Sequence, residues 1–97
     1  MELTSPRQLQ LDLAQRVRER RQEHGWSRRE LAERAGVALG TLRLFERTGK
    51  IALTRLVLVA SALGCLSDFE ALFKPPIAAS LDEIEARARL GVSRKRQ

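Results

Sequence analysis

The sequence predicts an all-α fold, a compact bundle of five helices followed by a short C-terminal helix and a basic tail. Apolar residues recur at intervals of three and four, the period of a helix with one buried face. Helix-start and helix-stop residues punctuate the chain, and no segment alternates long enough to predict a sheet. We divide the chain into a flexible lead-in (1–8), a helical domain (9–74), a C-terminal extension (75–90) and a basic disordered tail (91–97).

Residues 9–24 form the first predicted helix. Leu13 and Val17 lie four apart on one face, charged residues occupy much of the rest, and Gly25 ends the helix. Trp26 then precedes the next helix, at the position of a hydrophobic staple. We expect this indole to pack in the core, with base stacking as the alternative.

The segment 26–50 predicts two short helices joined by a tight turn. Ser27 and Glu30 make a capping box, in which each side chain bonds the other residue's backbone amide, so a helix starts there. Gly36 can adopt the left-handed conformation that ends it, and a second helix is predicted over 39–47. This is the layout of a helix-turn-helix, whose second helix reads DNA in the major groove.

The faces of that second helix differ in chemistry. Leu42 and Phe45 lie three apart on its inward face, whereas Gly40, Arg43 and Arg47 point away from it. It is therefore the candidate recognition helix, and the bundle is predicted to be a DNA-binding domain.

The fourth predicted helix spans 53–63 and ends at Gly64. Its leucine-rich sequence predicts one wide inward face, made by Leu53, Leu56, Val57, Ala60 and Leu63.

The fifth helix is predicted to begin at a second capping box, Ser67 with Glu70, and to end before Pro75. It carries more apolar area than one short helix needs, so we take four of its residues as dimer candidates: Leu66, Phe69, Leu72 and Phe73. A third capping box, Ser80 with Glu83, predicts the short helix of the C-terminal extension.

The net charge of +6 is unevenly distributed. Between Arg16 and Arg55 there are eleven Lys or Arg and five Glu, whereas seven basic and seven acidic residues cancel outside that window. The positive field therefore covers the predicted helix-turn-helix, as the capture of DNA phosphates requires. A solvated face that keeps the protein soluble is the alternative. The basic end VSRKRQ likewise predicts either a solvated terminus or a loose DNA-binding arm.

The composition argues against an enzyme. The chain has one histidine, His24, one cysteine, Cys65, and no cluster of carboxylates, so we expect no catalytic residue, no metal site and no cofactor. Cys65 is expected to be a small core residue rather than a reactive thiol, and a lone cysteine fits a reducing cytosol. The longest apolar run, 56–66, is too short and interrupted to span a bilayer, and no signal segment opens the chain. We therefore expect a cytoplasmic, nucleoid-associated protein with no membrane partner.

Residues 9–73 resemble the Cro and lambda-repressor class of helix-turn-helix proteins, the XRE family. The resemblance rests on RVRERRQEHGWSRRELAERAGVALGTLRLFERTGK followed by LVLVASALG. It implies a sequence-specific transcriptional regulator that binds double-stranded DNA, as a homodimeric repressor on a palindromic operator. The form FERTGK and the trailing SLDEIEARARL are similar to HipB-type antitoxins. The alternative function is therefore an antitoxin that also binds and neutralises a HipA-like kinase toxin.

The resemblance also implies roles for individual residues. Ser27 and Arg28 are implied phosphate contacts, because backbone amides and the helix dipole favour an anion at that helix start; Arg29, Lys50 and Arg55 complete our predicted phosphate set. Arg21 and Glu46 correspond to a structural pair that joins the first helix to the recognition helix. The predicted base-reading residues are Leu39, Gly40, Thr41, Arg43, Leu44 and Arg47, in which Arg43 would pair with guanine O6 and N7 and Leu39 would contact a thymine methyl.

Three positions depart from the family's pattern. Arg28 stands where glutamine is common, which adds charge and should steepen the salt dependence of DNA binding. Ala38 stands where a serine or threonine often caps the recognition helix, and Gly40 lies inside that helix; each costs about 1 kcal/mol of helix stability. We therefore expect specificity to depend on Arg43, Arg47 and DNA shape.

Overall fold

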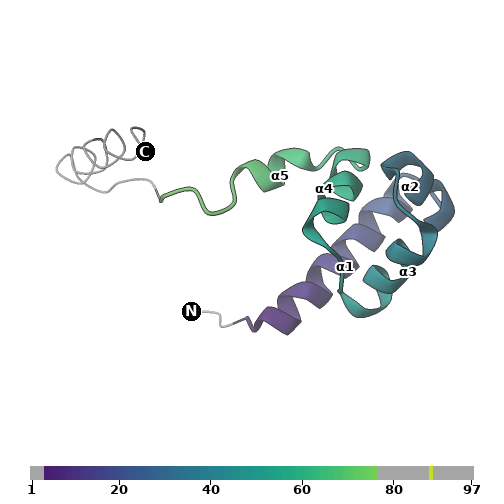
Figure 1. Cartoon of the computed structure of the whole chain (residues 1–97), viewed down its shortest axis with the longest axis horizontal. Helices are drawn as coiled ribbons and strands as arrows, with labels where there is room; N and C mark the ends of the chain where they lie inside the picture. Colours follow the sequence, from purple (N-terminus) through teal and green to yellow (C-terminus); the bar gives the residue numbers. More distant parts are fainter. Residues whose placement is uncertain (1–3, 77–87, 89–97) are drawn as a thin grey trace.

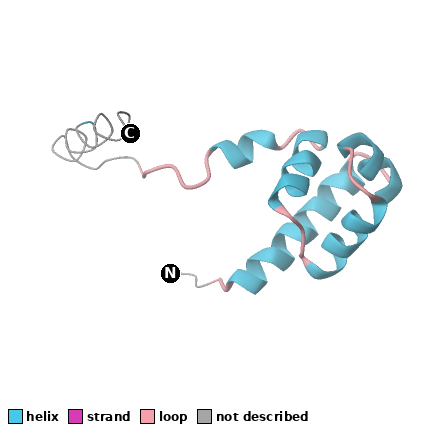
Figure 2. Ribbon diagram, viewed as in Figure 1, coloured by secondary structure: helices cyan, strands magenta, loops and turns pink. Residues whose placement is uncertain are grey.

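The computed structural model describes residues 4–76 and residue 88. Its helices are α1 (Pro6–Glu23), α2 (Arg28–Ala35), α3 (Leu39–Thr48), α4 (Leu53–Ala62) and α5 (Leu66–Glu70). No strand occurs among these residues, and the all-α prediction is confirmed (Figure 2). In Figure 1, α1 to α4 pack together and α5 extends away from them next to α4. The predicted capping box at 80–83 and the basic tail lie outside the described residues.

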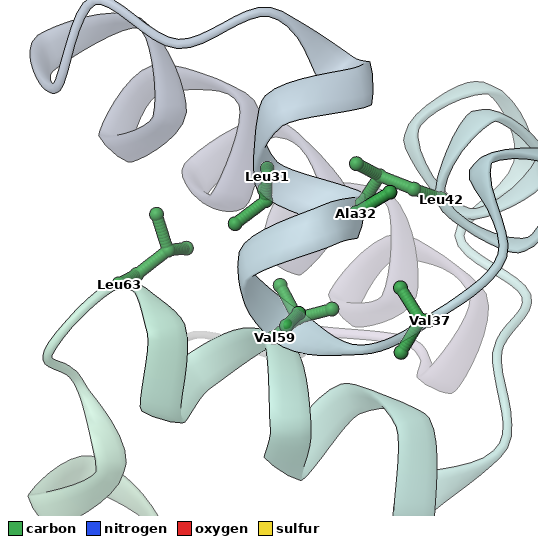
Figure 3. Packing of buried hydrophobic residues seen from close by; sticks show 7 residues of the cluster. Leu31, Ala32, Val37, Leu42, Val59 and Leu63 are labelled. Atoms are coloured by element: carbon green, nitrogen blue, oxygen red, sulfur yellow. The ribbon is translucent and has the colours of Figure 1, made fainter.

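The hydrophobic core is built around α2, which contributes Leu31, Ala32 and Ala35 on one buried face, as its helical spacing predicts (Figure 3). Three further segments complete the buried cluster. The turn after α2 contributes Val37, α3 contributes Leu42, and α4 with its C-cap contributes Val59 and Leu63. Several half-buried side chains pack against this cluster, among them Val17, Trp26 and Cys65. Trp26 and Cys65 therefore have the packing positions that we expected.

The first helix begins earlier than predicted, at Pro6 rather than Leu9. Ser5 caps it, since its Oγ accepts a hydrogen bond from the amide three residues on at 3.0 Å, and Pro6 occupies the first helical position, where its missing amide costs nothing. Arg7 donates from Nη1 to the carbonyl of Thr48, at the end of α3. The start of α1 is therefore held against α3, and the predicted first residue is wrong.

The buried face of α4 is rotated relative to the prediction. Ala60 and Leu63 are buried as expected, but Val59 is also fully buried and Leu53 is 66% exposed. Leu53 is the first residue of α4, and the first turn of this helix lies beyond the edge of the core. The prediction was wrong for Leu53 and missed Val59, while two further predicted residues, Leu56 and Val57, are half-buried.

The helix α5 is shorter than predicted and lacks the predicted cap. It starts at Leu66, so Ser67 lies inside its first turn, and the N-cap residue, Cys65, makes no side-chain capping bond. The helix ends at Glu70, well before the prolines that we expected to terminate it. Phe73 follows with a positive φ of 61° and a fully exposed side chain.

Candidate nucleic-acid interface

The capping box that starts α2 is present as predicted. The amide of Ser27 donates to Glu30 Oε1 at 3.0 Å, and the amide of Glu30 donates to Ser27 Oγ at 3.1 Å. Hydrogen bonding to the Glu30 carboxyl by the Ser27 amide, and then by the Ser27 hydroxyl, lowers the pKa of that carboxyl from its ordinary value. Gly36 ends the helix in the left-handed conformation, with φ of 74°. Both ends of α2 are thereby defined, and the turn to α3 begins at Gly36.

The outer face of α3 is exposed while its inner face is anchored. Leu42 and Phe45 are buried, which fixes the rotation of the helix about its axis. Ala38 precedes α3 with extended backbone and provides no side-chain capping bond, as its identity predicts. Four of the predicted base-reading residues are exposed, and two, Leu39 and Thr41, are half-buried. The exposed four are Gly40, Arg43, Leu44 and Arg47.

Arg21 and Glu46 form the pair that the resemblance implied. Arg21 donates from Nε to Glu46 Oε2 at 2.9 Å and from Nη2 to Oε1 at 3.0 Å, and the two side chains are 8% and 2% exposed. Arg21 Nη1 also donates to the carbonyl of Trp26 at 2.9 Å. A bidentate, nearly buried contact of this kind holds both groups in one geometry. The contact joins α1 both to α3 and to the turn that precedes α2.

A second arginine reaches the same carboxylate. Arg28 donates from Nε to Glu46 Oε1 at 3.0 Å, and its side chain is 41% exposed. Sequence reasoning missed this contact, because the two residues lie on different helices and no local spacing connects them. Glu46 therefore orients the guanidinium of Arg28 at the start of α2, while the terminal nitrogens of Arg28 donate no hydrogen bond within the described residues.

Four arginines from three helices surround one open pocket of about 390 Å³. Arg28 comes from α2, Arg43 and Arg47 from α3, and Arg18 from α1, with Glu46 between them. A predicted phosphate contact thus lies beside two predicted base-reading residues. Arg18 was absent from the predicted site, although its position three residues before Arg21, on the same side of α1, is a signal that could have identified it.

The remaining predicted phosphate contacts do not line this pocket. Arg29 is exposed on α2, and Arg55 is exposed on α4. Lys50 follows α3, where its amide donates to Thr48 Oγ1 at 3.2 Å, and it borders a separate, largely apolar pocket.

The four dimer candidates lie at the α5 end of the molecule. Leu66, Leu72 and Phe73 are exposed, and Phe69 is half-buried. Among the described helices, α4 is the one that packs closely against α5.

Over residues 4–76, His, Cys, Asp and Glu side chains never gather in a group of three or more that could hold a metal ion. In the same range no helix has the length and apolar character needed to cross a membrane.

A model of the helix-turn-helix family matches residues 17–69, from the second half of α1 into α5. The chain belongs to this helix-turn-helix family. The match is of the XRE type, which makes the protein a DNA-binding transcription regulator. No curated protein matches the chain. The family match thus covers α2, α3 and the Arg21–Glu46 pair.

Proposed function

We propose that this helix-turn-helix protein is a sequence-specific repressor that binds a palindromic operator as a homodimer, with α3 in the major groove. The observation that carries the proposal is the exposed outer face of α3 next to four arginines. Such a face combines groups that approach base edges with groups that neutralise phosphates. A regulator of this kind acts on the chromosome, and we place it in the cytoplasm, on the nucleoid.

Sequence readout is assigned to the outer face of α3. Arg43 is exposed there and presents the planar fork that pairs with guanine O6 and N7 in the major groove. Gly40 allows close approach of the backbone, because nothing lies within 4 Å of a Cβ built at that position. Leu44 offers an exposed apolar contact, so thymine methyl groups and DNA shape complete the readout.

Phosphate binding is assigned to the start of α2 and to basic residues around α3. The free amides at the start of α2 and its dipole favour an anion beside Ser27 and Arg28. Arg29, Lys50 and Arg55 would bind flanking phosphates from their exposed positions. These contacts supply affinity without sequence preference and make binding strongly dependent on salt.

Dimerisation is assigned to the apolar residues at the α5 end. Two copies joined there would place their α3 helices about one turn of DNA apart, roughly 34 Å, as a palindrome requires. Sedimentation equilibrium tests this part. Leu72→Glu, which puts a charge on the exposed surface, should shift the protein towards monomer, and a wild-type monomer at all concentrations would refute the dimer.

Selection of bound duplexes from a random pool, at stated salt, tests the proposed function directly. We expect enrichment of one palindromic sequence with two half-sites a helical turn apart. Recovery of a pool that is still random after repeated rounds would contradict sequence-specific binding.

An antitoxin role is the second candidate function. It rests on the similarity of FERTGK to HipB-type antitoxins and on the exposed apolar surface at α5, which also suits a protein partner. Co-expression with the product of the adjacent gene tests it. A stable complex that suppresses the toxicity of a kinase-like neighbour would support this role, whereas a neighbour that is not toxic and forms no complex would leave the regulator alone.

A further inference from the structure

The pocket between α1, α2 and α3 carries more positive charge than the described acidic residues neutralise. Four arginines and one glutamate line it. Both oxygens of Glu46 already accept hydrogen bonds, from Arg21 and Arg28. Within the described residues, the other lining arginines, Arg18, Arg43 and Arg47, have no acidic partner. Guanidinium groups that face one space repel one another, so an anion there would be stabilised by all of them.

The geometry of Arg28 favours a phosphate in particular. Its Nε is held by Glu46 at 3.0 Å, so the direction of the guanidinium plane is set before any ligand arrives. The two terminal nitrogens remain for an anion, and an arginine that meets two oxygens of one phosphate binds in a fixed, bidentate geometry. Because Glu46 is itself fixed by Arg21, this arrangement is built into the core of the fold.

Arg18 contributes to the lining of the pocket from α1. It is an exposed side chain without a hydrogen bond or ion pair in the described part of the chain, yet it lines the same pocket as Arg28. We propose that Arg18 and Arg28 together bind one phosphate of the DNA backbone, next to the bases that α3 reads, with Glu46 as the residue that positions Arg28. This inference rests on the proposed function and adds α1 to the DNA-contacting surface.

The matched control for Arg18 is Arg16. Both are exposed arginines on α1, but Arg16 does not line the pocket. Each variant, Arg18→Ala and Arg16→Ala, removes one positive charge and so changes the overall field equally. Circular dichroism establishes that both variants retain the wild-type helix content.

Fluorescence anisotropy with a labelled duplex, measured over a series of salt concentrations, gives the first test. Arg18→Ala should make the negative slope of log affinity against log salt shallower by about one, on selected and random duplexes alike. This change corresponds to the loss of one phosphate contact. Arg16→Ala should leave the slope unchanged. Identical slopes for the two variants would overturn the inference.

Neutral phosphate substitution provides the second test. Duplexes that each carry one methylphosphonate identify the phosphates that wild-type protein needs. One such position should weaken the binding of wild-type protein more than the binding of Arg18→Ala, because in that variant only Arg28 still contacts the phosphate. If every position affects the two proteins equally, Arg18 binds no individual phosphate. If wild-type protein binds no duplex at all, the proposed function itself fails, which is a distinct outcome.

Discussion

Arg21 donates two hydrogen bonds to Glu46, at 2.9 and 3.0 Å, and this nearly buried contact joins the first helix to the third. Neither residue needs to touch DNA for this pair to matter. It sets the distance between α1 and α3, and through Glu46 it also sets the direction of Arg28. Stability and the proposed phosphate site therefore share one carboxylate.

Removal of that carboxylate should be costly. Glu46→Ala leaves Arg21 buried without its partner, which typically costs about 3–5 kcal/mol of unfolding free energy. Urea unfolding measures the loss. The control is Glu23→Ala, which removes an exposed pair with Arg20 at 3.6 Å and should change the unfolding midpoint little. Similar midpoints for the two variants would show that the Arg21–Glu46 contact does not stabilise the fold.

The glycines of the helix-turn-helix should respond to alanine in opposite directions. Gly40→Ala should raise the unfolding free energy by about 1 kcal/mol, because Gly40 lies inside α3 with open space around it. Gly49→Ala should lower it strongly. Gly49 has a φ of 78°, and an added Cβ would lie 2.9 Å from the backbone of Gln10.

Gly36 separates those two effects. It has a φ of 74° but no neighbour within 4 Å of an added Cβ, so Gly36→Ala should cost only the left-handed conformation, about 1–2 kcal/mol. Thermal unfolding of all three variants should rank them Gly40→Ala, Gly36→Ala, Gly49→Ala in decreasing stability. A Gly49→Ala variant as stable as Gly36→Ala would mean that α1 does not approach α3 as closely as described.

The capping box should make stability depend on pH. Hydrogen bonds from Ser27 lower the pKa of Glu30 in the folded state, so the ionised carboxylate stabilises the fold. This contribution is complete above the unfolded pKa, near 4.5, and is lost as the pH falls through the lower folded pKa. The stability difference between wild type and Glu30→Ala should therefore shrink on acidification. A difference for Glu30→Ala that does not change with pH would refute the coupling.

The recognition helix should gain stability from a cap. Ala38 already has the extended backbone of an N-cap residue, with φ of −68° and ψ of 143°, but no side-chain oxygen. Ala38→Ser should therefore add about 0.5–2 kcal/mol of unfolding free energy by satisfying an amide at the start of α3. Chemical denaturation measures this gain. Ala38→Val, which adds volume but no hydrogen-bond acceptor, is the control, and equal stability of the two variants would show that no cap forms.

Local sequence signals predicted much of the fold. The box at Ser27 and Glu30 and the stop at Gly36 act within one helix turn, so α2 follows from neighbouring residues alone. A similar pattern, Ser67 with Glu70, failed because α5 begins two residues earlier than a Ser67 cap would place it, with Cys65 as the N-cap residue. A capping pattern shows where a helix is able to start, whereas packing on α4 decides where this one does.

Contacts between helices account for what the sequence left unseen. Leu53 and Val59 differ in burial because the core ends beside the first turn of α4, which periodicity alone does not show. The contact of Arg28 with Glu46 and the place of Arg18 in the same pocket depend on how three helices pack. The pair of Arg21 and Glu46 was expected only because the chain resembles a known family.

Comparison of Arg43→Ala with Arg28→Ala on two duplexes tests the central claim most directly. The claim is that α3 reads bases while its surroundings bind phosphates. On the selected duplex, Arg43→Ala should lose about 1–3 kcal/mol of binding free energy, and much less on a scrambled duplex of the same length and salt. Arg28→Ala should lose similar amounts of binding free energy on both duplexes, and its affinity should depend less steeply on salt. Equal losses on the two duplexes for both variants would contradict the account.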